Sequence, residues 1–332
     1  MSVGVAIGVF CVSLAACLTA SLLFGRRLDA VSEHLGASEG LHGILTALGA
    51  DAPEIATAIA AVAASHGSLG VGVVIGSNVF NLAALLGLSA VIAGRVAIHR
   101  HGLLFNGAAA LLVAGIATAL VLGALDGIVA TILLVAVFGP YVLLLSIRPA
   151  RLHRVVPPGR ARRFLVAAVR EEVEDMHTGE PVRVATRIDG LVLVISLAVI
   201  VGASVGMVQA ATDLGDHWGV SDIVIGTLVL ASLTSLPNVL TAVRLALHGR
   251  GAAVVSEALN SNSLNVFAGL ALPALVVSLT AASGVERFSV WFLLGLTVLS
   301  IALAYSNHGL ARVEGTLIAL LYVPFVIVIA TR

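Results

Sequence analysis

The sequence predicts an all-α integral membrane protein with ten transmembrane helices, arranged as two inverted five-helix repeats. The first observation behind this prediction is composition, because 59% of the 332 residues are hydrophobic and only 11% are charged. Soluble domains carry about 25% charged residues. The other two observations are the placement of the arginines and an internal duplication. Together they indicate a membrane protein without a separate soluble domain.

Ten apolar stretches follow one another along the chain, and each is long enough to cross a bilayer core of about 30 Å. The first has no basic flank before it and is too long for the apolar region of a secretory signal, so we expect a retained span. Its two cysteines, Cys11 and Cys17, are expected to pack as small apolar residues. The ten predicted spans are 3–24, 40–65, 69–93, 103–123, 127–147, 188–209, 222–247, 252–281, 289–306 and 314–331.

The basic residues set the orientation of these spans. The chain has no lysine, so all 18 basic residues are arginine. With both termini outside, only Arg287 and Arg332 fall on the outer side, which the positive-inside rule favours. The absence of lysine also indicates a high-GC bacterial genome, and hence the plasma membrane, which is the bacterial inner membrane. The arginines on the cytoplasmic side are Arg26, Arg27, Arg95, Arg100, the nine from Arg148 to Arg187, Arg244, Arg250 and Arg312.

Two pairs of motifs repeat at one constant spacing. They are GADAPEIATAI (49–59) with TSLPNVLTAV (234–243), and GSNVFN (76–81) with NSNSLN (260–265). Pro53 aligns with Pro237 and Asn78 with Asn262, each pair 184 residues apart (237 − 53 and 262 − 78). A gapless offset across separate motifs indicates an internal duplication. Five predicted spans separate the copies, so they insert in opposite directions, as in the inverted repeats of secondary transporters.

The duplication divides the chain into three parts. We expect a first transmembrane half at 1–147 and a second at 188–332, with the duplicated segments at about 46–94 and 230–278. A linker loop at 148–187 joins them on the cytoplasmic side. It is basic and proline-rich at first, and its FLVAAVREEVEDM stretch suits a short amphipathic helix on the inner membrane surface.

Polar residues inside the predicted spans form a candidate cation site. Ionisable side chains are costly there and usually functional, and Asp51, Glu54 and Glu257 are three of them. The prolines break helices and free carbonyls that need a partner. Carboxylate, hydroxyl and amide oxygens suit calcium, magnesium or sodium. The remaining candidates from the repeated motifs are Ser77, Asn78, Asn81, Ser261, Asn262 and Asn265.

Structural alternatives stay open for these residues. Asparagine and serine also hold membrane helices together, and Asp51 suits the cap of a helix that restarts after the break. For Glu257, the alternative to a role as a cation ligand is an ion pair with Arg244 or Arg250. No nucleophile–base or catalytic metal pattern is present, so neither an enzyme nor a bound cofactor is expected. The expected partners are inorganic cations and the lipid bilayer, without nucleic acid.

The motifs resemble those of a known family. ALGADAPEIATAI with GSNVFNLAALLGLSAVI, and LASLTSLPNVLTAV with NSNSLNVFAGLALPAL, resemble the two alpha-repeats of the sodium/calcium exchangers in the calcium/cation antiporter superfamily. The resemblance implies a secondary antiporter that exchanges calcium for sodium by alternating access. It makes Glu54 the central ligand of the first half, and Thr234 with Ser235 a hydroxyl pair of the second.

The second half departs from the family pattern. Asn238 stands where the resemblance leads one to expect a second central carboxylate, and Asn265 where aspartate is common. Our hypothesis is that Asp51, Glu54 and Glu257 form a rearranged acidic site. The departures leave two other functions open, a proton-coupled or monovalent-cation exchanger and a non-transporting membrane scaffold with a vestigial site.

Overall fold

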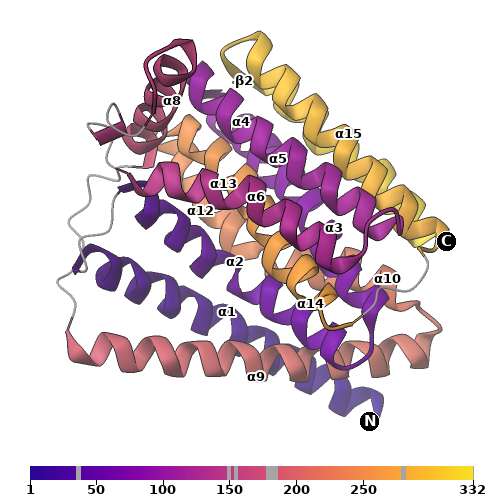
Figure 1. The fold of residues 1–332 in the computed structure, drawn as a ribbon. Coiled ribbons are helices and arrows are strands. Elements are labelled where there is room, and N and C mark those ends of the chain that lie inside the picture. Colours follow the sequence, from indigo (N-terminus) through magenta and orange to yellow (C-terminus); the bar gives the residue numbers. More distant parts are fainter. Residues whose placement is uncertain (35–38, 148–150, 153–155, 177–185, 278–281, 332) are drawn as a thin grey trace.

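The computed structural model describes residues 1–34, 39–147, 151–152, 156–176, 186–277 and 282–331 (Figure 1). Within this part of the chain, eight helices are long and apolar enough to cross a membrane, and a pair bent by 46° makes a ninth if it is one span. The remaining predicted span, 252–281, which is the eighth in order, falls on the helical stretch Gly251–Ala274, whose Glu257 and asparagines make it more polar than the others. Its last predicted residues, 278–281, lie outside the described residues.

The elements of the first half follow the predicted spans closely. They are α1 (Val3–His34), α2 (Glu39–Ala63), α3 (Gly67–Asn81), the π-helix η1 (Leu82–Leu88), α4 (Ser89–Ala93), β1 (Arg95–Ala97), α5 (Arg100–Val121) and α6 (Gly127–Ser146). The predicted linker contains α8 (Arg160–Met176), so its amphipathic stretch is a helix.

The second half repeats the order of the long helices. Its elements are α9 (Arg187–Trp218), α10 (Asp222–Val224), the π-helix η2 (Ile225–Leu230), α11 (Ala231–Thr234), α12 (Leu236–Leu247), α13 (Gly251–Leu264), the π-helix η3 (Asn265–Ala271), α14 (Leu272–Ala274), α15 (Gly284–Ser306), β2 (Gly309–Ala311) and α16 (Arg312–Ala330). The strand β2 follows α15, whereas β1 precedes α5. The first residues of α9, α13 and α15 each follow those of α1, α3 and α5 by 184 positions, from 3 to 187, 67 to 251 and 100 to 284. The duplication therefore extends over whole helices beyond the two motifs.

The first helices of the two halves lie side by side and run in opposite directions (Figure 1). Near the end of α1, Arg27 Nη1 lies 2.7 Å from Oδ1 of Asp189, in the first turn of α9. At the other end, Met1 N lies 2.7 Å from Oδ2 of Asp213, near the end of α9. Two helices that occupy equivalent places in the duplication are thus antiparallel.

The two prolines of the duplicated motifs have different effects. Pro237 lies in the first turn of α12, after the 46° bend that follows Thr234. Pro53, in contrast, lies inside a continuous α2, so the predicted break in the first half is absent. Proline cannot donate to the carbonyl four residues before it. Here that carbonyl, on Gly49, accepts a hydrogen bond from Ser21 Oγ of α1 at 3.1 Å, which explains how α2 stays intact.

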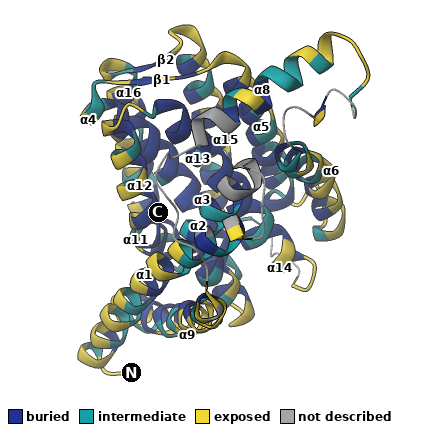
Figure 2. Cartoon of the chain, turned by 90° about the vertical axis from the view of Figure 1, so that its left-hand side faces the viewer, coloured by how far each residue is buried: buried dark blue, intermediate teal, exposed yellow. Residues whose placement is uncertain are grey.

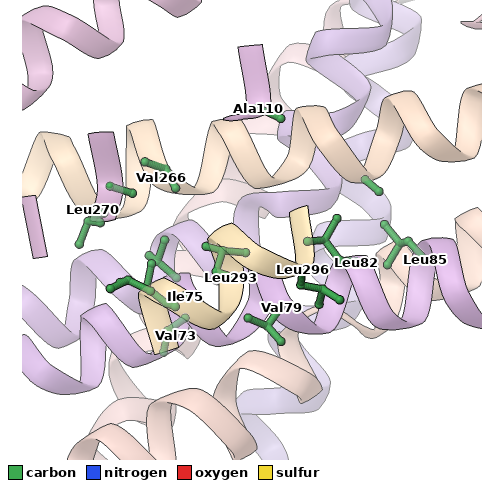
Figure 3. Close-up of a cluster of buried hydrophobic side chains, with 14 of the residues drawn as sticks. Val73, Ile75, Val79, Leu82, Leu85, Ala110, Val266, Leu270, Leu293 and Leu296 are labelled. Atoms are coloured by element: carbon green, nitrogen blue, oxygen red, sulfur yellow. The ribbon is translucent and has the colours of Figure 1, made fainter. Parts of the chain in front are cut away.

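Helices α3 and α13 lie at the centre of the bundle. In the span that contains α3, 94% of the most apolar window is buried, against 17% for α1 and 22% for α16, whose outward apolar side chains suit lipid. Figure 2 shows this division between a buried interior and exposed outer helices. Figure 3 shows apolar side chains of both halves packed together in the interior, among them Ile75, Val79, Val266 and Leu293.

Small residues allow the closest helix contacts. A Cβ added at Gly76 would lie 2.5 Å from the carbonyl oxygen of Thr227 in η2.

One feature was not predicted by the all-α interpretation: β1 and β2 pair as a short antiparallel ribbon, with Val96 opposite Leu310. It joins the segment after α4 to the segment before α16.

Candidate cation site

Two carboxylates of α2 form the acidic part of the site. Asp51 and Glu54 are both 0% exposed, although they are three residues apart on one helix. Asp51 Oδ1 accepts hydrogen bonds from Ser261 Oγ and, at 2.8 Å, from Asn238 Nδ2. Glu54 Oε1 accepts from Ser235 Oγ at 2.7 Å and from Asn238 Nδ2 at 3.2 Å. Both acids of the first half are therefore held by residues of the second half.

Asn238 lies between the two carboxylates. It stands 184 residues after Glu54, where the family resemblance leads one to expect an acid. The side-chain amide donates to one oxygen of each acid, and its own Oδ1 is buried without a hydrogen-bond partner. The residue that departs from the family pattern thus occupies the centre of the site.

The asparagines of α3, α13 and η3 extend this network. Asn78 and Asn262 each donate to the backbone carbonyl of the other. Asn81 Nδ2 donates to Ser261 Oγ at 3.2 Å and to Asn262 Oδ1 at 3.3 Å, and Asn265 Nδ2 donates to Asn78 Oδ1 at 3.4 Å. Because Ser261 also binds Asp51, the asparagines and the acids belong to one network.

Nine of the twelve predicted site residues are joined by these bonds. The largest exposed fraction among them is 7%, at Asn262, so the network is closed to solvent in this conformation. An ion could reach it only after helices move. The nine are Asp51, Glu54, Asn78, Asn81, Ser235, Asn238, Ser261, Asn262 and Asn265.

Three predicted residues stand apart from the network. Ser77 and Thr234 are buried, and each donates to a carbonyl of its own helical stretch, that of Val74 at 3.0 Å and that of Leu230 at 2.8 Å. Glu257 lies within electrostatic range of Asp51. Its Oε2 is buried and has no hydrogen-bond partner, so neither of the two arginines proposed as ion-pair partners donates to that oxygen.

Several oxygens of the network retain acceptor capacity. Buried polar atoms nearly always have a partner, so these oxygens are available to accept a bond from water or to bind an ion. They are Asp51 Oδ2, Glu54 Oε2, Asn81 Oδ1, Asn238 Oδ1 and Asn265 Oδ1. All are hard oxygen donors of the kind that calcium and sodium prefer. Within the described residues, no three histidine, cysteine, aspartate or glutamate side chains gather as a metal cluster. The site therefore combines two carboxylates with neutral oxygens.

Sequence analysis missed the polar residues that connect this site to the outer helix pair. Thr57, one turn after Glu54, donates to Ser204 Oγ of α9 at 3.2 Å. Ser204 in turn lies 3.8 Å from Cys17 Sγ of α1. Thr57 repeats at Thr241, 184 residues later (241 − 57), whereas Ser204 lies in an apolar stretch without a motif. Only tertiary structure brings it to α2.

Curated relatives match parts of the chain. MaX1, a sodium/calcium exchanger of Methanosarcina acetivorans, is 28% identical over 141 residues, which are 42% of this chain and 40% of that protein. The inner membrane protein YrbG of Escherichia coli is 30% identical over 143 residues, 42% of this chain and 44% of that protein. Sodium/potassium/calcium exchanger 1 of Bos taurus is 32% identical over 130 residues, which are 37% of this chain and 11% of that protein. Each match therefore spans less than half of the relative.

Whole-chain comparison gives the fold and the family. The sodium-calcium exchanger NCX_Mj, in a structure soaked with 2.5 mM Na⁺ and 0.1 mM Sr²⁺, superposes with a TM-score of 0.63 at 23% identity and covers 99% of both chains, which shows a common fold. The sodium/calcium exchanger protein family matches residues 5–148 and 189–331, which include both halves and leave out the linker. The chain therefore belongs to the sodium/calcium exchanger protein family.

Proposed function

We propose that this cation antiporter exchanges Ca²⁺ for Na⁺ by alternating access, with the nine-residue network as its cation site. One observation carries the proposal: Asp51 and Glu54 are fully buried, and each keeps one unpartnered oxygen. Two carboxylates on adjacent turns are too costly to bury without compensating positive charge. One divalent ion or two monovalent ions would supply that charge.

The oxygens of both halves provide the remaining ligands. Calcium takes six to eight oxygens at flexible geometry, from carboxylates, amides and carbonyls. The unpartnered oxygens of Asn81, Asn238 and Asn265 suit this role beside the two acids. Because sodium binds to the same kinds of oxygen, the two ions would compete for one closed site, which is the condition for exchange. The names of the relatives MaX1 and NCX_Mj, both sodium/calcium exchangers, support the same assignment.

The membrane topology that supports this mechanism is two inverted five-helix repeats with ten spans. Three observations favour it. Equivalent helices begin 184 residues apart, the equivalent helices α1 and α9 are antiparallel, and Asn78 and Asn262 each donate a hydrogen bond to the backbone carbonyl of the other. We place the termini outside and the 148–187 linker in the cytoplasm, from the arginine distribution. The bacterial inner membrane is the proposed location.

A second candidate function is exchange of a monovalent cation or a proton. It is favoured by Asn238 and Asn265, which leave the second half without an acid at either position. Of the three predicted acids, Asp51 and Glu54 alone belong to the hydrogen-bonded network, and Glu257 remains outside it. If Asp51 keeps its proton, a lone carboxylate remains, and it can bind either a proton or a monovalent ion.

Ion flux in proteoliposomes tests the proposal. The protein is reconstituted, and calcium uptake is followed under an outward sodium gradient and then under a proton gradient. We expect sodium-driven uptake that is lost in Glu54→Gln and retained in Asp216→Asn, whose carboxylate is exposed on the last turns of α9. Uptake driven only by protons would favour the second function.

A binding measurement distinguishes a cation transporter from a non-transporting scaffold. A ligand that binds the folded state stabilises it in proportion to the logarithm of its concentration above the Kd. We expect calcium and sodium to raise the unfolding temperature of the wild type, and Glu54→Gln to reduce the calcium effect. Absence of stabilisation by any cation, together with absence of flux, would contradict transport and favour the scaffold.

A further inference from the structure

The linker helix α8 is docked into the transmembrane bundle. Its Ala168, Val169 and Glu172 are all 0% exposed. Val169 packs in one buried cluster with Ile44 of α2, Tyr141 of α6 and Leu264 of α13. The preceding glutamate, Glu171, accepts hydrogen bonds from the first turn of α5 through Gly102 N at 2.8 Å. A helix that was predicted to lie on the membrane surface thus has one face inside the protein.

Glu172 places a carboxylate between two transmembrane helices. Its Oε2 accepts from Asn106 Nδ2 of α5 at 2.6 Å and from Ser256 Oγ of α13 at 2.7 Å. Asn106 Nδ2 also donates to Ser256 Oγ at 2.9 Å. Hydrogen bonds to a carboxylate are roughly twice as strong as neutral ones, so this carboxylate holds α8, α5 and α13 together.

Tyr141 of α6 continues the network toward the cation site. Its hydroxyl lies within hydrogen-bond distance of two side-chain oxygens, Asn106 Oδ1 at 2.9 Å and Asn260 Oδ1 of α13 at 2.5 Å. The hydroxyl has one proton, so it can donate to only one of these oxygens at a time. Ser256 and Asn260 are four residues apart, on one face of α13. That face is bound by the α8 carboxylate at one turn and by Tyr141 at the next.

One turn of α13 joins this network to the cation site. Asn260 binds Tyr141 of α6, Ser261 binds Asp51 of α2, and Asn262 binds Asn78 of α3. Consecutive helical residues point about 100° apart, so the three bonds fix the turn from three sides. Any rotation of α13 that changes the position of Asn260 also moves the Ser261 hydroxyl relative to Asp51.

We propose that Glu172 is a positioning residue for the cation site, through which the linker helix α8 sets the cation affinity of the transporter. The proposal rests on the proposed function for the identity of the ion. Glu172 does not touch the network of nine residues. It acts through Ser256, Asn106, Tyr141 and Asn260. Groups that hydrogen-bond directly to metal ligands change metal affinity by roughly 10–100-fold when they are removed. Glu172 acts through further side chains, so we expect an effect at or below the lower end of that range.

Calcium kinetics in proteoliposomes test the proposal with four variants. Glu172→Ala removes the acceptor and is expected to raise the KM for calcium by about five- to tenfold, at or just below the lower end of the range for direct partners of metal ligands, with little change in maximal rate. Glu172→Gln keeps an acceptor oxygen for Asn106 and Ser256 and should remain within roughly threefold of wild type, since one neutral hydrogen bond is worth about half a charged one. Tyr141→Phe keeps the ring stacked on Phe105 and should raise the KM as well. Glu171→Gln, on the same helix but outside the network, is the matched control.

Hydrogen exchange provides a readout that does not require transport. The backbone amides of residues 259–263 should exchange faster in Glu172→Ala and Tyr141→Phe than in Glu171→Gln. If the wild type itself shows no cation response, the proposed function fails, and the exchange data alone decide whether α8 positions α13. Unchanged exchange and an unchanged KM in Tyr141→Phe would overturn the proposal even if Glu172→Ala does not fold. A Glu172→Gln variant as impaired as Glu172→Ala would also overturn it.

Discussion

Asn78 and Asn262 donate side-chain hydrogen bonds to each other's backbone carbonyl, and both bonds measure 3.0 Å. The two residues occupy equivalent positions, 184 residues apart. Each residue both donates a hydrogen bond to the other and accepts one from it, as equivalent residues across a two-fold axis do. Glu54 and Asn238 are also equivalent, 184 residues apart, and one bond joins them, from Asn238 Nδ2 to Glu54 Oε1 at 3.2 Å. The proposed cation site therefore lies where the two halves face each other.

The reciprocal pair predicts matched losses of stability. Asn78→Ala leaves the buried carbonyl of Asn262 without its donor, and Asn262→Ala does the same to Asn78. Each should lower the free energy of unfolding by about 1–3 kcal/mol, and the two effects should be similar. Thermal unfolding in detergent measures both, with Thr316→Ala as control because its exposed hydroxyl binds only its own helix. A large effect at one position and none at the other would contradict a symmetric contact.

Replacing the central asparagine by an acid should strengthen calcium binding. Asn238→Asp puts a third carboxylate beside Asp51 and Glu54, in place of the amide that donates to both. Without cations the like charges repel, and we expect the unfolding temperature to fall by on the order of 3 °C. Calcium should then stabilise the variant more than it stabilises the wild type. Equal calcium shifts in the two proteins would show that residue 238 does not face the ion.

Removing one of the two network acids should change ion preference. Asp51→Asn leaves Glu54 as the single charge in the network, which suits one monovalent ion better than a divalent one. We expect calcium uptake to fall by at least about tenfold, which corresponds to about 1.4 kcal/mol of binding free energy, while sodium still raises the unfolding temperature. Glu257→Gln, measured beside it, tests the three-acid hypothesis. Calcium uptake equal to wild type in Glu257→Gln would remove Glu257 from the site.

The sequence predicted most residues of the hydrogen-bonded network. The 184-residue repeat identified Asn78 and Asn262, the family resemblance identified Asn238, and the cost of charge in a membrane identified Asp51 and Glu54. All five belong to the network that the structure shows. Ser77 and Thr234 were predicted on the same grounds but bind backbone carbonyls of their own helical stretches. Helical spacing alone does not tell which side of a buried helix faces the partner half.

The parts that sequence did not predict depend on contacts between distant segments. A serine of α1 binds the carbonyl that Pro53 leaves free in α2, and α8 is docked against residues of α5, α6 and α13. Residues such as Tyr141 and Ser204 lie in stretches whose local pattern indicates only an apolar helix. Their partners are more than 30 residues away in the chain, so no local motif records the contact.

Helix packing at Gly76 predicts a severe effect from a small substitution. A Cβ there would lie 2.5 Å from the backbone carbonyl oxygen of Thr227, which cannot move aside as a flexible side chain can. Gly76→Ala should therefore destabilise the protein by about 1–3 kcal/mol. Gly115→Ala in α5 is the matched control, because nothing lies within 4 Å of its added Cβ. That control should stabilise the helix by roughly 0.5–1 kcal/mol. Thermal unfolding of both variants separates packing at α3 from a general effect of alanine.

The hydrogen bond between Ser21 and the Gly49 carbonyl predicts that two substitutions depend on each other. Ser21→Ala leaves that buried carbonyl unpartnered and should cost about 1–3 kcal/mol of unfolding free energy. Pro53→Ala restores a backbone N–H that can donate to the same carbonyl. In the Pro53→Ala background, Ser21→Ala should therefore cost less than about 1 kcal/mol. A double-mutant cycle by thermal unfolding measures this coupling, with Ser306→Ala as control because its hydroxyl binds only its own helix. Equal costs of Ser21→Ala in both backgrounds would show that Ser21 stabilises α2 in another way, because the proline-freed carbonyl is the only group that the two substitutions share.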